Sequence, residues 1–365
     1  MSIVNVCSKL WARIRESKWT TLYISCAFCQ MIISIAIESV ILRLNSESIL
    51  RLDALGTTYD LNSDDSRTHA YKNYDYGNYK TQYQSILDGN IWFMVFEAFL
   101  TALSLSALFF QNTIEIISIV IINILLLFFA ATQIIQSGNW TNRINGQIII
   151  DAGSDSGVEP FSKVIIIWEV TQLFFLVICA GASVFLGHKL YKQFGWNIYK
   201  KIGANIQTQK MYRTYLVFLL LLKLDFFLLM SFQILNLVFL FGDASHNTRS
   251  IILQSIMVVL VVPMVCLALW GVRTENKVAM IIYVLASVVT IINFIYILAE
   301  FIIKRDENLL TLLDILGIVL TLLSLFVAYC ASRNFGSGLI DHFQKYGAGA
   351  VNLESGNRKR FSIDD

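Results

Sequence analysis

Two opposite charges, Lys223 and Asp225, lie inside the apolar stretch 214–241. A charge at the centre of a membrane helix costs roughly 2.5 to 3.5 kcal/mol on insertion scales, so such residues usually serve an ion or proton pathway or have a buried partner. The stretch still inserts, because 20 Leu, Ile, Phe and Val residues between Leu216 and Phe241 outweigh this cost. Both residues are therefore candidates for transport chemistry or for a structural ion pair.

The two charges need partners on other helices. Residues two positions apart point about 200° away from each other around a helix, so Lys223 and Asp225 do not face one another. Opposite charges within reach stabilise both ionised forms, so we predict that Lys223 is charged and paired with a carboxylate across helices. Our candidate partners are Glu97, Glu169 and Asp314.

Further acids follow a common pattern. Five lie three to seven residues from the lumenal end of a predicted span, namely Glu38, Glu97, Glu169, Glu300 and Asp314, whereas Glu115 lies near a cytosolic end. At this depth they can reach water cheaply, which favours a structural interpretation. The alternative is a polar cavity, open to the lumen, that takes up cations or protons above Lys223 and Asp225.

Membrane helices must position these residues. The chain of 365 residues is 56% hydrophobic and 15% charged, with a mean hydropathy of +0.62. A span needs about 20 apolar residues. Eight stretches have this length: 20–42, 91–110, 114–135, 164–186, 214–241, 250–271, 278–303 and 309–331. We therefore predict an all-α polytopic fold with one membrane domain over 20–331.

The distribution of Lys and Arg predicts the orientation. One side of the eight-span layout carries 17 of these residues and the other carries 10, so the positive-inside rule places both termini in the cytosol. The segment 1–19 then precedes a signal anchor, and 332–365 is a disordered cytosolic tail. The sequon at Asn139 falls on the lumenal side and is a candidate glycosylation site. In the tail, Ser362 follows three basic residues and is a candidate phosphorylation site.

The predicted loops differ in character. The lumenal loop 43–90 is rich in aspartate and tyrosine but lacks the EF-hand calcium pattern, so we expect a solvated loop. The lumenal loop 137–163 contains an apolar run, 147–151, that could form a short strand.

The cytosolic segment 187–213 is basic and amphipathic. Apolar residues recur every four positions from Leu190 to Ile206, among several lysines. This spacing predicts an interfacial helix with Trp196 and Tyr199 at the headgroups and Lys200 and Lys201 facing anionic lipid. A docking site for a cytosolic trafficking partner is the alternative.

Several classes of function are excluded at this stage. Five of the six cysteines lie in apolar runs, and the four histidines are scattered outside the spans. No metal-ligand spacing, nucleophile motif or phosphate-binding loop is present, so we expect neither an enzyme nor a cofactor or metal site. The basic residues are spread along span-flanking segments, which argues against nucleic-acid binding.

Three segments carry a family resemblance. The run Phe194–Ala204, followed by Met211–Tyr215 and Leu222–Phe227, resembles a fungal family of uncharacterised multi-pass Golgi apparatus membrane proteins. The resemblance implies a Golgi or neighbouring endomembrane location and supplies no activity.

Two functions remain open. The first is a transporter-like carrier of ions or small solutes that uses the buried charges. The second is a non-catalytic structural or trafficking protein that recruits partners through its cytosolic segment and tail.

Overall fold

The computed structural model describes residues 3–61, 66–152, 164–202, 206–242, 248–304, 308–333 and 335. All regular structure in these ranges is helical, which confirms the all-α prediction. The helices are α1 (Ile3–Ile14), α2 (Lys18–Leu61), α3 (Ser66–Phe110), α4 (Thr113–Ala152), α5 (Val164–Ile202), α6 (Ile206–Gly242), α7 (Thr248–Arg273), α8 (Lys277–Lys304) and α9 (Asn308–Arg333). Within the described residues, eight of them, α2 to α9, are long and apolar enough to cross a membrane.

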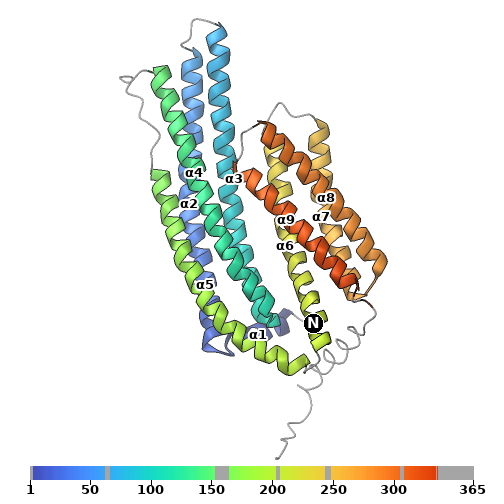
Figure 1. Cartoon of the computed structure of the whole chain (residues 1–365). Helices are drawn as coiled ribbons and strands as arrows, with labels where there is room; N and C mark the ends of the chain where they lie inside the picture. Colours follow the sequence, from blue (N-terminus) through green and yellow to red (C-terminus); the bar gives the residue numbers. More distant parts are fainter. Residues whose placement is uncertain are drawn as a thin grey trace, which may run out of the picture.

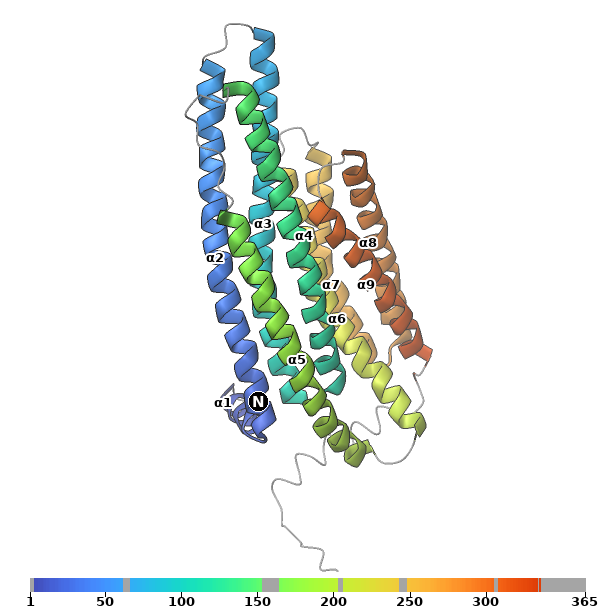
Figure 2. The same ribbon diagram turned by 60° about the vertical axis from the view of Figure 1, so that its left-hand side comes forward.

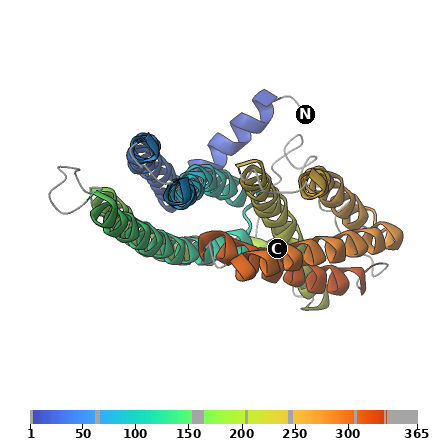
Figure 3. The same ribbon diagram turned by 90° about the horizontal axis from the view of Figure 1, so that it is seen from above.

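The spans form two four-helix bundles. In the first bundle α2 packs against α3 and α5, and α4 packs against the same two helices. In the second bundle α6 packs against α7 and α9, and α8 packs against the same two helices. The bundles meet mainly through α3 and α4 on one side and α6 and α9 on the other (Figures 1 and 3). Consequently α2 and α5 form an outer face of the molecule.

The two ends of the molecule are distinct. At one, called the α1 end, α1 lies beside the turn between α3 and α4 (Figure 1). At the other, called the hairpin end, α2 and α3 extend together, with α4 beside them, beyond α5 and the second bundle (Figure 2). Each bundle runs up, down, up and down between these ends, so both bundles begin at the α1 end.

The same turn joins the second and third helix of each bundle. Gln111 and Glu275 both adopt a positive φ of 51°. An asparagine follows in both turns. The backbone N–H of Asn112 donates to Ala107 O at 3.0 Å, and that of Asn276 donates to Gly271 O at 2.9 Å. Each bond closes the preceding helix. Each asparagine side chain then accepts from the backbone N–H two residues on and caps the following helix. The 111–113 gap is therefore a turn between two spans, as predicted.

The segment 43–90 is largely helical. The first and second spans continue without a break into it as the long ends of α2 and α3. Ile41 and Asn45 on α2 and Ile86 and Asn90 on α3 are buried near the point where the long ends of the two helices begin. The expectation of a solvated loop is corrected here, because a polar composition does not stop a helix that has an antiparallel partner to pack against. The side chains of 55–83, including the tyrosine-rich patch, lie outside the described residues.

Two further segments are corrected. The run 147–151 is the last part of α4 and not a strand. The segment 187–202 continues α5 instead of forming a separate interfacial helix. Its apolar stripe begins with Leu190 and Phe194, which are 0% and 1% exposed and belong to the protein core. A stripe that was expected to face lipid therefore packs, in this part, on protein.

Aromatic side chains fill the contact between the bundles. Phe99 of α3 and Phe227 of α6 stack with ring centroids 3.9 Å apart. Trp92 of α3 contacts Phe129 of α4 and Phe232 of α6 at 5.1 and 6.0 Å. Offset and tilted ring pairs of this kind add about 0.5 to 1.5 kcal/mol each beyond the area they bury. They hold α3, α4 and α6 in a fixed register.

Candidate functional site

The interior of the first bundle carries three buried acids. Glu38 on α2, Glu97 on α3 and Glu169 on α5 are 1%, 1% and 3% exposed. Within the described ranges none of them has an ion-pair partner. Isolated buried carboxylates are unfavourable unless they are neutralised by a proton or a cation. This half of the molecule therefore has an affinity for positive charge that its own described side chains do not satisfy.

Glu97 is held by a polar network that crosses the bundle. Gln30 Nε2 on α2 donates to Glu97 Oε1 and Oε2 at 3.3 and 3.1 Å. The same nitrogen donates to Asn123 Oδ1 on α4 at 2.8 Å. Asn123 Nδ2 in turn donates to Ile119 O at 3.0 Å and to Ser183 Oγ on α5 at 3.4 Å. All four helices of the bundle thus meet around one carboxylate.

A cavity of about 180 Å³ adjoins this network. Its polar lining comes from all four helices and includes the Glu97 carboxylate, amides and hydroxyls. The residues with polar side chains are Tyr23, Gln30, Glu97, Thr101, Ser104, Asn123 and Ser183, together with Cys26, Cys29 and Cys179. Tyr23 is 3% exposed and its hydroxyl has no hydrogen-bond partner among the described residues. The cavity therefore offers one carboxyl group and unused hydrogen-bonding capacity.

Two of the three acids lie nearer the hairpin end. Glu38 is eight residues beyond Gln30 on α2, about 12 Å along the helix axis. It lies within electrostatic reach of Glu169 and Glu97. Both oxygens of Glu169 and Oε2 of Glu38 lack hydrogen-bond partners in the described structure, as do both side-chain polar atoms of Gln136 and Gln172. A series of buried polar groups without hydrogen-bond partners thus lies between the cavity and the hairpin end.

The second bundle contains a separate polar cluster. Asp225 is 0% exposed and accepts a hydrogen bond from Tyr283 Oη on α8 at 3.3 Å. Asp314 on α9 is 1% exposed and accepts from Asn236 Nδ2 on α6 at 3.4 Å. Gln254 on α7 donates to Gln233 on α6, and Asn293 on α8 donates weakly to both glutamines at 3.5 Å. Both aspartates are therefore anchored within their own bundle and do not reach Lys223.

Lys223 pairs with a different acid from those predicted. Its ammonium lies 2.5 Å from Glu115 Oε1 at the start of α4, donates to Ser106 Oγ on α3 at 2.7 Å and lies 5.4 Å from the centre of the Phe110 ring. The prediction of a carboxylate partner is confirmed, and the choice of Glu97, Glu169 or Asp314 is corrected. The candidates followed from depths counted from the helix ends, but the helices do not all end at one level. The α3–α4 turn instead is buried beside the middle of α6.

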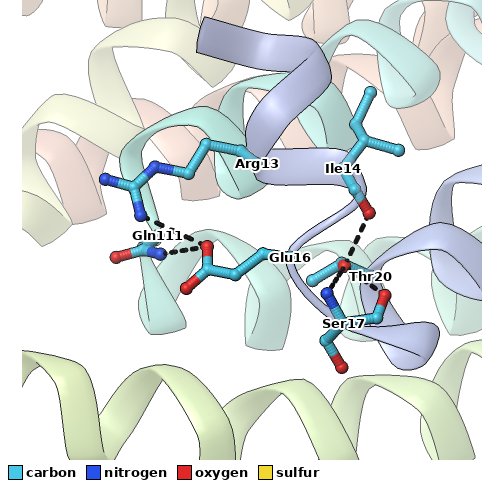
Figure 4. A network of polar contacts seen from close by, with 6 residues as sticks. All are labelled: Arg13, Ile14, Glu16, Ser17, Thr20 and Gln111. Atoms are coloured by element: carbon cyan, nitrogen blue, oxygen red, sulfur yellow. Dashed lines mark hydrogen bonds and ion pairs between the residues drawn. The ribbon is translucent and has the colours of Figure 1, made fainter.

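A polar contact fastens α1 to this turn (Figure 4). Glu16 Oε2 accepts from Gln111 Nε2 at 2.9 Å and from Arg13 Nη1 at 3.2 Å. Ser17 caps α2 by accepting from Trp19 N at 3.2 Å, while Thr20 donates to Ile14 O at 2.8 Å. The N-terminal helix is thereby attached to both α2 and α3.

The remaining predicted site residues lie either at the surface or outside the described residues. Asn139 is exposed on α4, whereas Thr141 of the same sequon is 1% exposed. Trp196, Tyr199, Lys200 and Lys201 belong to the last part of α5, but their side chains lie outside the described residues. Ser362 also lies outside the described part of the chain.

The uncharged half of the site was not predicted. Gln30 donates to Glu97 and to Asn123, and Asn123 donates to Ser183, but none of the three is ionisable. The available signal was an amide inside an apolar run, because a buried amide must find a hydrogen-bond partner on a neighbouring helix. The free cysteines of the described chain, three of which line the cavity, carry no disulfide.

Comparisons with known proteins give one informative similarity. The chain is 24% identical over 272 residues to a UPF0658 Golgi apparatus membrane protein of Schizosaccharomyces pombe, a match that covers 67% of this chain and 74% of that protein. No family model and no solved structure matches the chain significantly. The similarity confirms the predicted resemblance to uncharacterised fungal Golgi proteins. With eight helices able to cross a membrane, the chain is a multi-pass protein of the Golgi apparatus membrane.

Proposed function

We propose that this protein is a non-catalytic carrier of small cationic solutes and that the interior of the α2–α5 bundle is the carrier site. The observation that supports the proposal is the set of Glu38, Glu97 and Glu169, buried in one bundle without an ion-pair partner in the described structure. Intramembrane acids that face a bundle interior commonly mark cation or proton pathways.

Electrostatics favours a cation as the solute. Three carboxyl groups lie buried in one bundle, and a buried carboxylate is unfavourable without a cation beside it. A cation entering the bundle supplies this missing partner. An anion would meet three acids and no compensating cation among the described residues of this interior.

The second bundle and the Lys223–Glu115 pair have a structural part in this proposal. Lys223 is already neutralised by Glu115, and Asp225 accepts from Tyr283. These contacts connect helices and leave the first bundle as the location of unpaired charge.

Flux through reconstituted protein tests the proposal. Purified full-length chain in sealed liposomes is expected to release trapped monovalent cation or protons down a gradient. Glu97→Gln should reduce the rate at least about tenfold, because the amide keeps the shape and removes the charge that binds the cation. Glu47→Gln is the matched control, since Glu47 is exposed and pairs with Arg43 at 3.0 Å outside the interior.

Two results would oppose the carrier function. The first is the absence of flux from wild-type protein that is folded and correctly inserted, which would favour the structural or trafficking alternative. The second is equal flux through wild type and Glu97→Gln. The thermal unfolding midpoint of each variant shows whether the protein tested was folded.

A further inference from the structure

The cavity beside Glu97 opens on the outer face of the first bundle. Its lining includes Cys29 on α2 and Ile178 on α5, and the latter side chain is 56% exposed. Because the bundles meet through α3, α4, α6 and α9, the seam between α2 and α5 points away from the second bundle. In a chain that crosses a membrane, this exposed seam faces lipid.

The opening lies at hydrocarbon depth. Cys29 is eleven residues beyond Lys18, the first residue of α2, or about 17 Å along the axis. Ile178 is fourteen residues beyond Val164 on the antiparallel helix α5, or about 21 Å. Counted from these helix ends, both positions lie about 9 Å or more inside a hydrocarbon core of about 30 Å. A molecule dissolved in the bilayer can therefore reach this opening directly.

Polar side chains line part of an otherwise mostly apolar cavity, and Glu97 carries the carboxyl group among them. Gln30 holds Glu97 in place through both carboxylate oxygens. The unpartnered hydroxyl of Tyr23, 3% exposed, lies in the same lining. A head group that fits must therefore be cationic and able to donate hydrogen bonds to a carboxylate and to a phenol oxygen.

We propose that this cavity binds an amphiphile that has a protonated amine as its head and an apolar chain as its tail. The amine would donate to Glu97 and Tyr23, while the chain leaves between Cys29 and Ile178 into the lipid. A cavity of about 180 Å³ corresponds to roughly six water volumes, enough for the head and the first few carbons. The inference rests on the proposed function in taking Glu97 as the cation site, and it names the class of solute.

Native mass spectrometry of the full-length protein in phosphatidylcholine nanodiscs tests this inference. The probes are octadecylamine, the neutral octadecanol of equal chain length, and ethylamine, which has the head without the chain. We expect one octadecylamine to remain bound, with an affinity at least about tenfold above those of the other two probes. Glu97→Gln should abolish this preference for the amine over the alcohol.

Two pairs of variants locate the site. Ile178→Trp places a bulky side chain at the opening and should weaken octadecylamine binding, whereas Ile167→Trp, at an exposed position on α5 outside the cavity, should not. Asp314→Asn removes a buried acid from the other bundle and serves as the control for Glu97→Gln. Because Ile178 and Ile167 are both exposed, this pair remains informative even if Glu97→Gln does not fold.

The outcomes separate this inference from the carrier function. Equal binding of octadecanol and octadecylamine, or binding that Ile178→Trp leaves unchanged, would overturn the amphiphile site. Tight binding of ethylamine that is insensitive to Ile178→Trp would mean entry from water and would also overturn it. Cation flux without octadecylamine binding leaves the carrier function standing alone. Specific octadecylamine binding by protein that moves neither small cations nor octadecylamine across the liposome membrane supports the site and removes the carrier function.

Discussion

The Lys223 ammonium lies 2.5 Å from Glu115 Oε1 and joins the second bundle to the first. Glu115 is almost fully buried, with 2% of its side chain exposed, whereas 35% of the Lys223 side chain is exposed. Two positions further along α6, Asp225 points into the second bundle and accepts from Tyr283. Within one turn of α6, the side chain of Lys223 therefore contacts the first bundle and the side chain of Asp225 contacts the second.

Removing the lysine should destabilise the protein more than removing the pair. Lys223→Met leaves Glu115 buried without its cation and should cost about 2 to 3 kcal/mol, below the roughly 3 to 5 kcal/mol of a fully buried pair because Lys223 is partly exposed. The double variant Lys223→Met with Glu115→Gln should recover most of this loss. Thermal unfolding of purified protein in detergent measures both effects.

The matched control for this cycle is Lys210→Met, an exposed lysine near the start of the same helix. It should leave the unfolding midpoint unchanged. If the double variant is as unstable as the sum of the two single variants, the residues do not act as a pair and the contact is not what holds α4 to α6.

Hydropathy was sufficient to predict the membrane helices. All eight predicted spans appear, since a run of about 20 apolar residues has few alternatives to a spanning helix. The turn at Gln111 and Asn112 also followed from length, because one helix over both spans would have been far longer than the bilayer is thick. These properties depend on local composition alone.

Properties that depend on neighbouring helices were not predictable in the same way. The stripe that begins with Leu190 and Phe194 has the same period whether it faces lipid or protein, so its place in the core could not be read from spacing. The partner of Lys223 required the relative height of α4 and α6, which no single helix encodes. The network around Gln30 and Asn123 requires the pairing of four helices and was missed for the same reason.

The asparagine caps of the two corresponding turns should contribute equally. Asn112→Ala and Asn276→Ala each remove a side-chain acceptor from a helix N-terminus and should each lower the free energy of unfolding by about 1 kcal/mol. Replacement by Asp, which can accept the same hydrogen bond, should retain most of the stability. Chemical unfolding in mixed micelles compares the four variants. A loss from Asp as large as that from Ala would show that capping is not the cause.

Gly317 should tolerate no side chain of appreciable size. A Cβ atom at this position on α9 would lie 3.2 Å from Phe232 Cδ2 and 3.3 Å from Phe294 Cζ, two rings in the core of the second bundle. Gly317→Val should therefore cost about 1 to 3 kcal/mol through overpacking. At Gly181 on α5 a Cβ would meet nothing within 4 Å, so Gly181→Val is the control. Equal unfolding midpoints for the two variants would contradict the packing of α9 on α6 and α8.

Both termini should face the cytosol. The even number of candidate spans places the N-terminus and the end of α9 on the same side, and the excess of Lys and Arg there predicts which side it is. Epitope tags added before residue 1 and after residue 365 should both be digested by protease added outside sealed Golgi vesicles. A tag inserted in the α2–α3 hairpin should be protected until detergent opens the vesicles. Protection of a terminal tag in intact vesicles would reverse the orientation, and the hairpin end would then face the cytosol.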